Sequence, residues 1–180
     1  MKVTIISYSL SGNNNALAER IAAEFAAEHI KISEPKPRTM RTIMWDVLFN
    51  RTPHVIPGAK YVPDSDLIIF MGPVWIGRIA TPLRAYFKHF KLRKCKYAFV
   101  SISGGADGPN PKLAHELNKR MGRQPEVLID MHIADLLPQD PKPTRENTSH
   151  YLLNENDIKN LTGKIVTKLH ETLEVKENIY

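Results

Sequence analysis

The sequence contains one cysteine, Cys95, among its 180 residues. A single thiol excludes an internal disulfide and any metal centre built from several cysteines. No apolar run is long enough for a transmembrane helix, and the N-terminal segment has the pattern of a buried strand rather than of a signal peptide. We therefore expect a cytoplasmic protein. The histidines have no metal-ligand spacing, and no Ser-His-Asp arrangement is recognisable, so we assign no metal site and no catalytic residue.

Apolar segments and helical patterns alternate along the chain. Strands are predicted at residues 3–8, 29–32, 66–71, 97–102 and 126–130, and helices at residues 16–28, 79–90, 112–121 and about 158–173. This alternation predicts an α/β three-layer sandwich with a five-stranded parallel sheet covered on both faces. The length suggests a single domain over residues 1–180. The connection between the second and third strands is long, which indicates an insertion at about residues 33–64.

The segment between the first strand and the first helix is polar. It contains Ser9, Ser11, Gly12, Asn13, Asn14 and Asn15. The first amides of a helix have no partner within the helix, and the helix dipole adds positive charge there, so such a loop can bind an anion. It has no lysine, as a P-loop would, and no G-x-G-x-x-G pattern. We interpret it as a seat for a terminal phosphate monoester. The alternative is an ordinary helix cap.

Two further loops follow the third and fourth strands, and all three loops should meet at the carboxyl edge of the sheet. The second loop contains Pro73, Val74, Trp75, Ile76, Gly77 and Arg78, and the third contains Ser103, Gly104, Gly105 and Asp107. The indole can stack on a flat ligand, and the glycines allow a sharp bend or a close approach of the backbone. A phosphate seat, a stacking aromatic and a glycine-rich loop suit a planar heterocycle on a phosphorylated chain, such as riboflavin phosphate.

On these three motifs the chain resembles the flavodoxin-like FMN-binding superfamily, from Lys2 to about Lys176. The first loop is similar to the family's phosphate-binding loop, the second to its isoalloxazine loop with Trp75 as the aromatic, and the third to its loop around the pyrimidine edge of the flavin. The matching positions of the first loop are Ser9, Ser11, Gly12 and Asn14. The resemblance implies FMN as cofactor and the strand order 2-1-3-4-5.

The charge distribution departs from the acidic electron carriers of this family. The formal net charge is +6, and Asp107 is the one carboxylate of the third loop. Seven lysines or arginines and no carboxylate lie between Arg78 and Lys96. This stretch is either a solvated helix face or a contact for an acidic protein, an anionic membrane surface or a phosphorylated substrate such as NADPH. No nucleic-acid-binding module is recognisable, so we expect no nucleic-acid partner.

The insertion contains an unusually apolar helix, predicted over residues 40–49. Such a helix is too apolar to lie bare on a monomer. It packs into the core, covers the flavin as a lid, or packs against a second subunit. His132 follows the fifth strand, where it either lines a substrate pocket or is a polar loop residue.

Three functions are consistent with these observations. The first is an FMN-dependent oxidoreductase that passes electrons from NAD(P)H to quinones or similar small acceptors. The second is a flavodoxin-type carrier that transfers electrons between redox proteins, and the third is a flavin-free binding module. The basic surface and the apolar insertion favour the first. In that case we expect Arg78 beside the polar edge of the flavin, where a guanidinium would stabilise negative charge on the reduced cofactor. The alternative is a surface arginine that points to solvent from the start of the basic helix.

Overall fold

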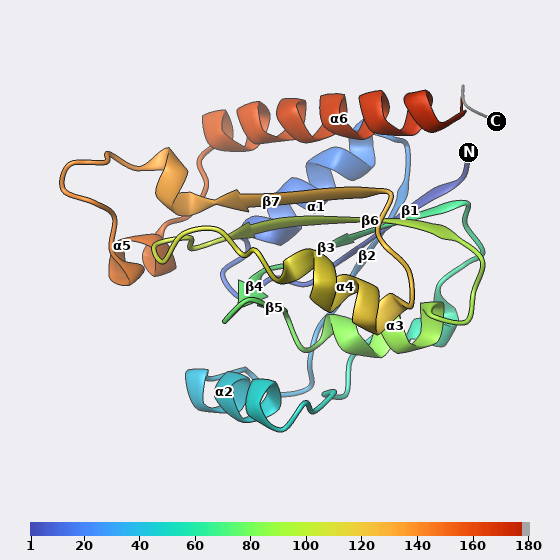
Figure 1. Cartoon of the computed structure of the whole chain (residues 1–180), viewed down its shortest axis with the longest axis horizontal. Coiled ribbons are helices and arrows are strands. Elements are labelled where there is room, and N and C mark those ends of the chain that lie inside the picture. Colours follow the sequence, from blue (N-terminus) through green and yellow to red (C-terminus); the bar gives the residue numbers. More distant parts are fainter. Residues whose placement is uncertain (178–180) are drawn as a thin grey trace.

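The computed structural model describes residues 1–177, with side chains through residue 173, and is built around a five-stranded parallel sheet (Figure 1). The strands are β1 (Val3–Ser7), β2 (Glu28–Lys31), β3 (Leu67–Met71), β6 (Lys96–Ser103) and β7 (Val127–His132). They are arranged in the order β2-β1-β3-β6-β7, with parallel pairing throughout. Numbered along the chain, these five strands have the order 2-1-3-4-5, which confirms the predicted topology.

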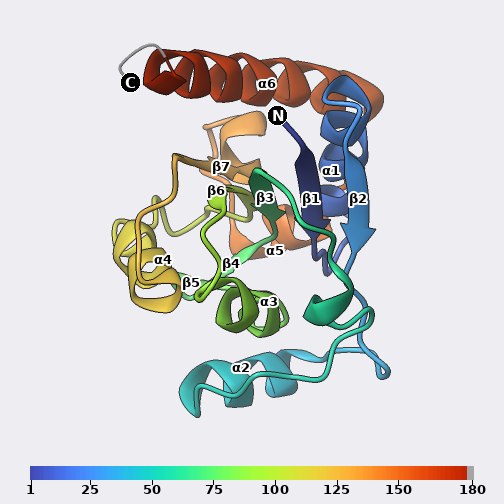
Figure 2. The same ribbon diagram turned by 90° about the vertical axis from the view of Figure 1, so that its right-hand side faces the viewer.

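Helices cover both faces of this sheet (Figures 1 and 2). Helices α1 (Asn13–Glu24) and α6 (Glu155–Glu177) form one layer, and α3 (Leu83–Phe90) and α4 (Leu113–Met121) form the other. Every residue of β1 and β3 is buried, because the two strands are central and covered on both sides. The three-layer sandwich is therefore confirmed. Within residues 1–177, no helix combines the length and the apolar character that crossing a bilayer requires.

A strand hairpin and an α-helix were not predicted from the sequence, nor was a 3₁₀ turn at Ile133–Leu136. A short antiparallel hairpin, β4 (Val74–Trp75) and β5 (Arg78–Ile79), follows β3, so α3 begins at Leu83 rather than near Ile79. Helix α5 (Arg145–His150) lies beyond the proline-rich connection and has no apolar periodicity. It is held at its start by a capping box between Thr144 and Asn147, a local signal that is independent of hydrophobic patterning.

The insertion at residues 33–64 contains α2 (Met40–Leu48) and a 3₁₀ turn at Ala59–Tyr61, and it is tied back by a bridge between Ser33 and Ile56. Figure 2 shows α2 on the outer side of α3, far from the layer of α1 and α6. Two of its side chains are buried, Ile43 and Val47. Four of its large apolar side chains, and Phe49 directly after it, are at least half exposed: Met40, Met44, Trp45, Leu48 and Phe49.

A buried ion cluster fixes this insertion to the body of the protein. The guanidinium of Arg38, with only 4% of its side chain exposed, forms ion pairs with Glu34 and Asp46. The hydroxyl of Tyr8, at the end of β1, donates to Glu34 at 3.0 Å. Burial lowers the pKa of Arg38, but its hydrogen bonds to Glu34 and Asp46 outweigh this effect and raise the pKa above its usual value. Arg38 therefore stays charged between its two carboxylates.

Removing this guanidinium should destabilise the fold strongly. We expect Arg38→Met to lower the free energy of unfolding by about 3–5 kcal/mol, because two largely buried carboxylates lose their counter-ion. Urea unfolding measures the change. The matched control is Arg93→Met, which removes an exposed pair with Asp64 and should cost at most about 1 kcal/mol. Equal effects of the two substitutions would show that the Arg38 cluster does not hold the insertion.

Candidate functional site

The three predicted loops meet at a cavity at the carboxyl edge of the sheet. The cavity has a volume of about 420 Å³, within the usual range of small-molecule sites. Ten of the predicted binding residues line it: Ser11, Asn14, Pro73, Val74, Trp75, Ile76, Ser103, Gly104, Gly105 and Asp107. The other six predicted residues do not belong to the lining that the described part of the chain forms: Ser9, Gly12, Asn13, Asn15, Gly77 and Arg78.

The first loop folds around the hydroxyl of Ser9. Its Oγ accepts hydrogen bonds from the amides of Gly12 at 2.9 Å and Asn14 at 3.2 Å. Gly12 has φ +102°, a conformation that favours glycine and turns the chain into α1. The hydroxyl therefore marks the position where the N-terminal amides of α1 converge, and the neighbouring Ser11 faces the cavity.

The asparagines of this loop bind other parts of the protein. The side chain of Asn14 forms two hydrogen bonds with the backbone of Ile102, at 2.8 and 3.0 Å, and is buried. The side chain of Asn13 bonds the backbone of Tyr151 and Leu153. We expected these side chains to be donors to a ligand. In the structure they join α1 to β6 and to the segment before α6, which leaves Ser9, Ser11 and backbone amides as the ligand donors of the loop.

Asn15 belongs to a second polar cluster, below the loop. Its side-chain oxygen accepts from the hydroxyl of Ser7 at 2.8 Å, and this hydroxyl lies 2.7 Å from Nε2 of His29. Burial, and then the charge of Lys31, lower the pKa of His29. A neutral His29 can still donate to Ser7 from Nε2, so this cluster stabilises the start of α1 without adding charge to the site.

Trp75 is held in place by two neighbours. Its ring makes an edge-to-face contact with Tyr8, with centroids 5.8 Å apart, and the guanidinium carbon of Arg38 lies 5.6 Å from the ring centre. The indole therefore has one contact to β1 and one to the insertion, and it still lines the cavity. Burial, and then the negative charge of Glu34, raise the pKa of Tyr8, so its hydroxyl remains a donor.

The turn that joins β4 to β5 is strained. Ile76 has φ +53° and Gly77 has φ +68°, as a two-residue hairpin with positive φ at both central residues requires. Glycine adopts this conformation freely, but a β-branched residue is an outlier there. The side chain of Ile76 is 67% exposed and forms part of the cavity wall. Strain of this kind tends to occur at functional sites.

The glycines of the third loop are explained by packing against the protein itself. Gly105 has φ +75°, and a methyl group there would collide with the side chain of His132. A methyl group at Gly104 would lie 2.9 Å from Oγ1 of Thr148 in α5. The expectation of a sharp bend is met at Gly105. These two positions give no evidence of their own for a close approach to a ligand.

Ser103 offers the clearest sign of a missing partner. It is 8% exposed and lines the cavity, and its buried Oγ has no hydrogen-bond partner within the described part of the chain. Buried hydroxyls are normally bonded, so an orphan beside a cavity points to a polar group of a ligand. Ser101, two residues earlier on β6, has a similarly unpartnered Oγ but does not line the cavity.

Parts of the wall come from α2, for which a lid over the site was one of three alternatives, and from α5, which the sequence did not reveal. Helix α2 contributes Met40, Ile43 and Met44, which form an apolar side. Helix α5 contributes residues 145, 148 and 149, and Arg145 pairs with Asp107 at 2.9 Å. The apolar periodicity of α2 was visible in the sequence, but its position over the loops depends on the Arg38 cluster.

Two residues that were weighed for the site, Arg78 and His132, do not line this cavity. Arg78 donates to the carbonyl of Val47 at 3.0 Å and faces a separate basic groove. The prediction that it lies beside the ring of a flavin in this cavity is therefore wrong. The reason is the unpredicted hairpin, which places Arg78 on β5 opposite Trp75. His132 packs beneath Gly105, close to Asp130, rather than on the cavity wall.

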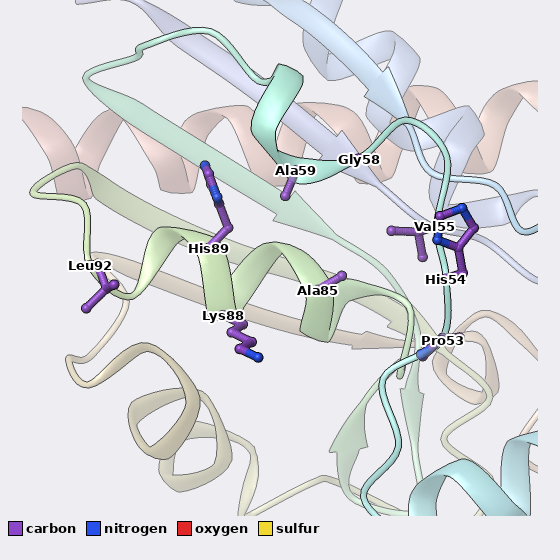
Figure 3. A pocket seen from close by; sticks show the side chains of 9 residues that line it. All are labelled: Pro53, His54, Val55, Gly58, Ala59, Ala85, Lys88, His89 and Leu92. Atoms are coloured by element: carbon purple, nitrogen blue, oxygen red, sulfur yellow. The ribbon is translucent and has the colours of Figure 1, made fainter.

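A second hollow of about 500 Å³ lies along α3 (Figure 3). Helix α3 contributes Ala85, Lys88 and His89, and the returning insertion contributes Pro53, His54, Val55, Gly58 and Ala59. None of the three loops contributes to it, so it is not our candidate site.

No family model and no curated protein matches this chain. Solved structures do match. A flavoprotein of Lactobacillus acidophilus NCFM, crystallised in complex with FMN, is 23% identical with a TM-score of 0.58, over 72% of this chain and 92% of that one. The chain has the flavodoxin-like fold. Two further structures are each 14% identical with a TM-score of 0.59. The match to a protein of Bacteroides eggerthii covers 82% of this chain and 93% of that one. The match to a protein of Bacteroides uniformis covers 79% of this chain and 98% of that one.

The conformation of the third loop can be tested directly. Gly105→Ala should destabilise the protein by more than about 2 kcal/mol, because the residue needs positive φ and its methyl group would collide with His132. Gly163→Ala is the control, because Gly163 lies in α6 with nothing within 4 Å of the added methyl. It should stabilise the protein by up to about 1 kcal/mol. Thermal unfolding measures both. A tolerated Gly105→Ala would contradict this loop conformation.

Proposed function

We propose that this protein is an FMN-binding flavoprotein that reduces a small acceptor such as a quinone, with NAD(P)H as the electron donor. The observation that carries the proposal is the single cavity in which the first, second and third loops converge, with the orphaned hydroxyl of Ser103 on its wall. The crystallised complex of the similar Lactobacillus flavoprotein with FMN supports the choice of cofactor.

The residues of the cavity suit the parts of FMN. The phosphate would lie at the N-terminus of α1, bound by backbone amides and by the hydroxyls of Ser9 and Ser11. The ring would lie between the second and third loops, with Trp75 against it and Ser103 bonded to its polar edge. When bound, FMN supplies hydride and electron transfer, and the protein positions it and excludes water.

The walls of the cavity favour a reductase over a protein-to-protein carrier. Met40, Ile43 and Met44 add an apolar side to the cavity, which suits a second planar molecule beside the flavin. Asp107, the one carboxylate of the described lining, is paired with Arg145. A carrier would instead leave the flavin edge open to a partner protein. In this protein α2 contributes part of the cavity wall instead, which supports a reductase.

Ser103→Ala tests the proposal. The free protein has no hydrogen bond to lose at this hydroxyl, so unfolding should change by no more than about 1 kcal/mol. Affinity for FMN should fall by about 2- to 12-fold, the equivalent of one neutral hydrogen bond of roughly 0.5–1.5 kcal/mol. Fluorescence titration with FMN measures it.

The matched control is Ser101→Ala, which removes an equally buried and unpartnered hydroxyl from the same strand but away from the cavity. It should leave FMN affinity unchanged. If neither the wild type nor Ser103→Ala binds FMN, the cofactor assignment is wrong. If the two serine variants bind FMN equally well, the ring does not lie against Ser103.

A further inference from the structure

A basic groove of about 750 Å³ lies between α3 and α4, on the other side of the hairpin turn from the cavity. Ile76 and Gly77 border the groove, and Ile76 also borders the cavity. Seven lysines and arginines line the groove. They are Arg78, Arg84, Lys88, Lys91, Lys112, Lys119 and Arg120.

Most of this positive charge is uncompensated. Glu116, the one carboxylate of the described lining, pairs with Arg120. Within residues 1–173, none of the other six cations has a carboxylate within ion-pair distance. Like charges gathered in a concave site repel one another and attract an anion.

Arg84 is the decisive residue, because it is buried as well as unpaired. It is 2% exposed, and its Nη1 donates to the carbonyls of Asp46 and Arg51 at 3.2 and 3.0 Å. Its Nε and Nη2 are buried without a partner among the described residues. Burial, and then the charge of Arg120, lower the pKa of Arg84 to about 10, so it is still charged at neutral pH. A solvated helix face does not account for a guanidinium that solvent scarcely reaches.

We infer that this groove binds the phosphate groups of a nucleotide, with Arg84 at its floor and Lys88 and Lys119 among the cations of its wall. Planar guanidinium groups bind phosphate oxygens in pairs, and the flexible lysines add point charges. The loop at α1 would take the phosphate of FMN, so the groove is a second and separate phosphate site.

The position and charge of the groove specify the nucleotide further, and this step rests on the proposed function. A ligand that reaches across the Ile76–Gly77 turn could place a planar ring in the cavity and its phosphates in the groove. A dinucleotide has this form. Six uncompensated cations exceed the needs of a diphosphate, which carries about two negative charges, and a phosphate monoester adds about 1.5 to 2 more. The groove therefore selects NADPH over NADH as the electron donor.

Adenosine 2′,5′-bisphosphate is the probe, because it carries the extra phosphate but no redox ring. Calorimetric titration at low salt compares wild type, Lys88→Gln/Lys119→Gln and the control Lys164→Gln/Lys168→Gln. The control removes the same charge from exposed positions of α6, on the opposite face of the sheet. We expect the groove variant to bind the probe about 2- to 30-fold more weakly than wild type and the control to bind as wild type does. Adenosine 5′-monophosphate should bind wild type more weakly than the probe.

Absence of probe binding to wild type would overturn the inference. Equal weakening in both double variants would also overturn it, because net charge alone would then explain the loss of affinity. FMN titrations on the same three proteins separate this result from the proposed function. If FMN binds and the groove variant loses no affinity for the probe, the groove inference fails alone. If FMN does not bind but the probe discriminates as expected, the groove remains a nucleotide-phosphate site and the flavin assignment fails.

Discussion

The buried guanidinium of Arg38 is the interaction on which the candidate site depends. It joins Glu34 and Asp46, both in the insertion, and it lies over the ring of Trp75. Tyr8 connects the same cluster to β1. Moving the insertion would leave buried charges without their partners, at a cost of about 3–5 kcal/mol, so the cluster favours this arrangement of the insertion relative to the sheet. That arrangement brings the apolar residues of α2 to the cavity.

Arginines outside this cluster hold the insertion from the other side. Arg78 bonds the carbonyl of Val47, and Arg84 bonds those of Asp46 and Arg51. Both arginines also line the basic groove. The segment that walls the cavity and the cations that line the groove are thus parts of one connected structure. An anion bound at Arg84 would stabilise the end of α2 as well as occupy the groove.

The architecture could be predicted because it follows from local patterns. Central strands such as Leu67–Met71 are continuous apolar runs, and turn residues separate them from amphipathic helices. The hairpin escaped prediction because Ile76 adopts a positive φ that its side chain disfavours. As a result, the sequence placed Arg78 beside the cavity rather than in the groove. Ser103 was predicted as a binding residue, but its unpartnered hydroxyl emerges only when the strands and loops are assembled. The same holds for Arg38, because Arg38 and its partner Glu34 lie in a segment without helical or strand periodicity before α2, and the sequence does not show that they meet Asp46 of α2.

The central claim is that the N-terminus of α1 holds the phosphate of a flavin. Parallel equilibrium titrations with FMN and riboflavin test it most directly, since the two ligands share the ring and differ in the phosphate. Hydrogen bonds to a charged group contribute roughly 1.5–3 kcal/mol, so FMN should bind at least about tenfold more tightly than riboflavin. Equal affinities for the two ligands would contradict the account.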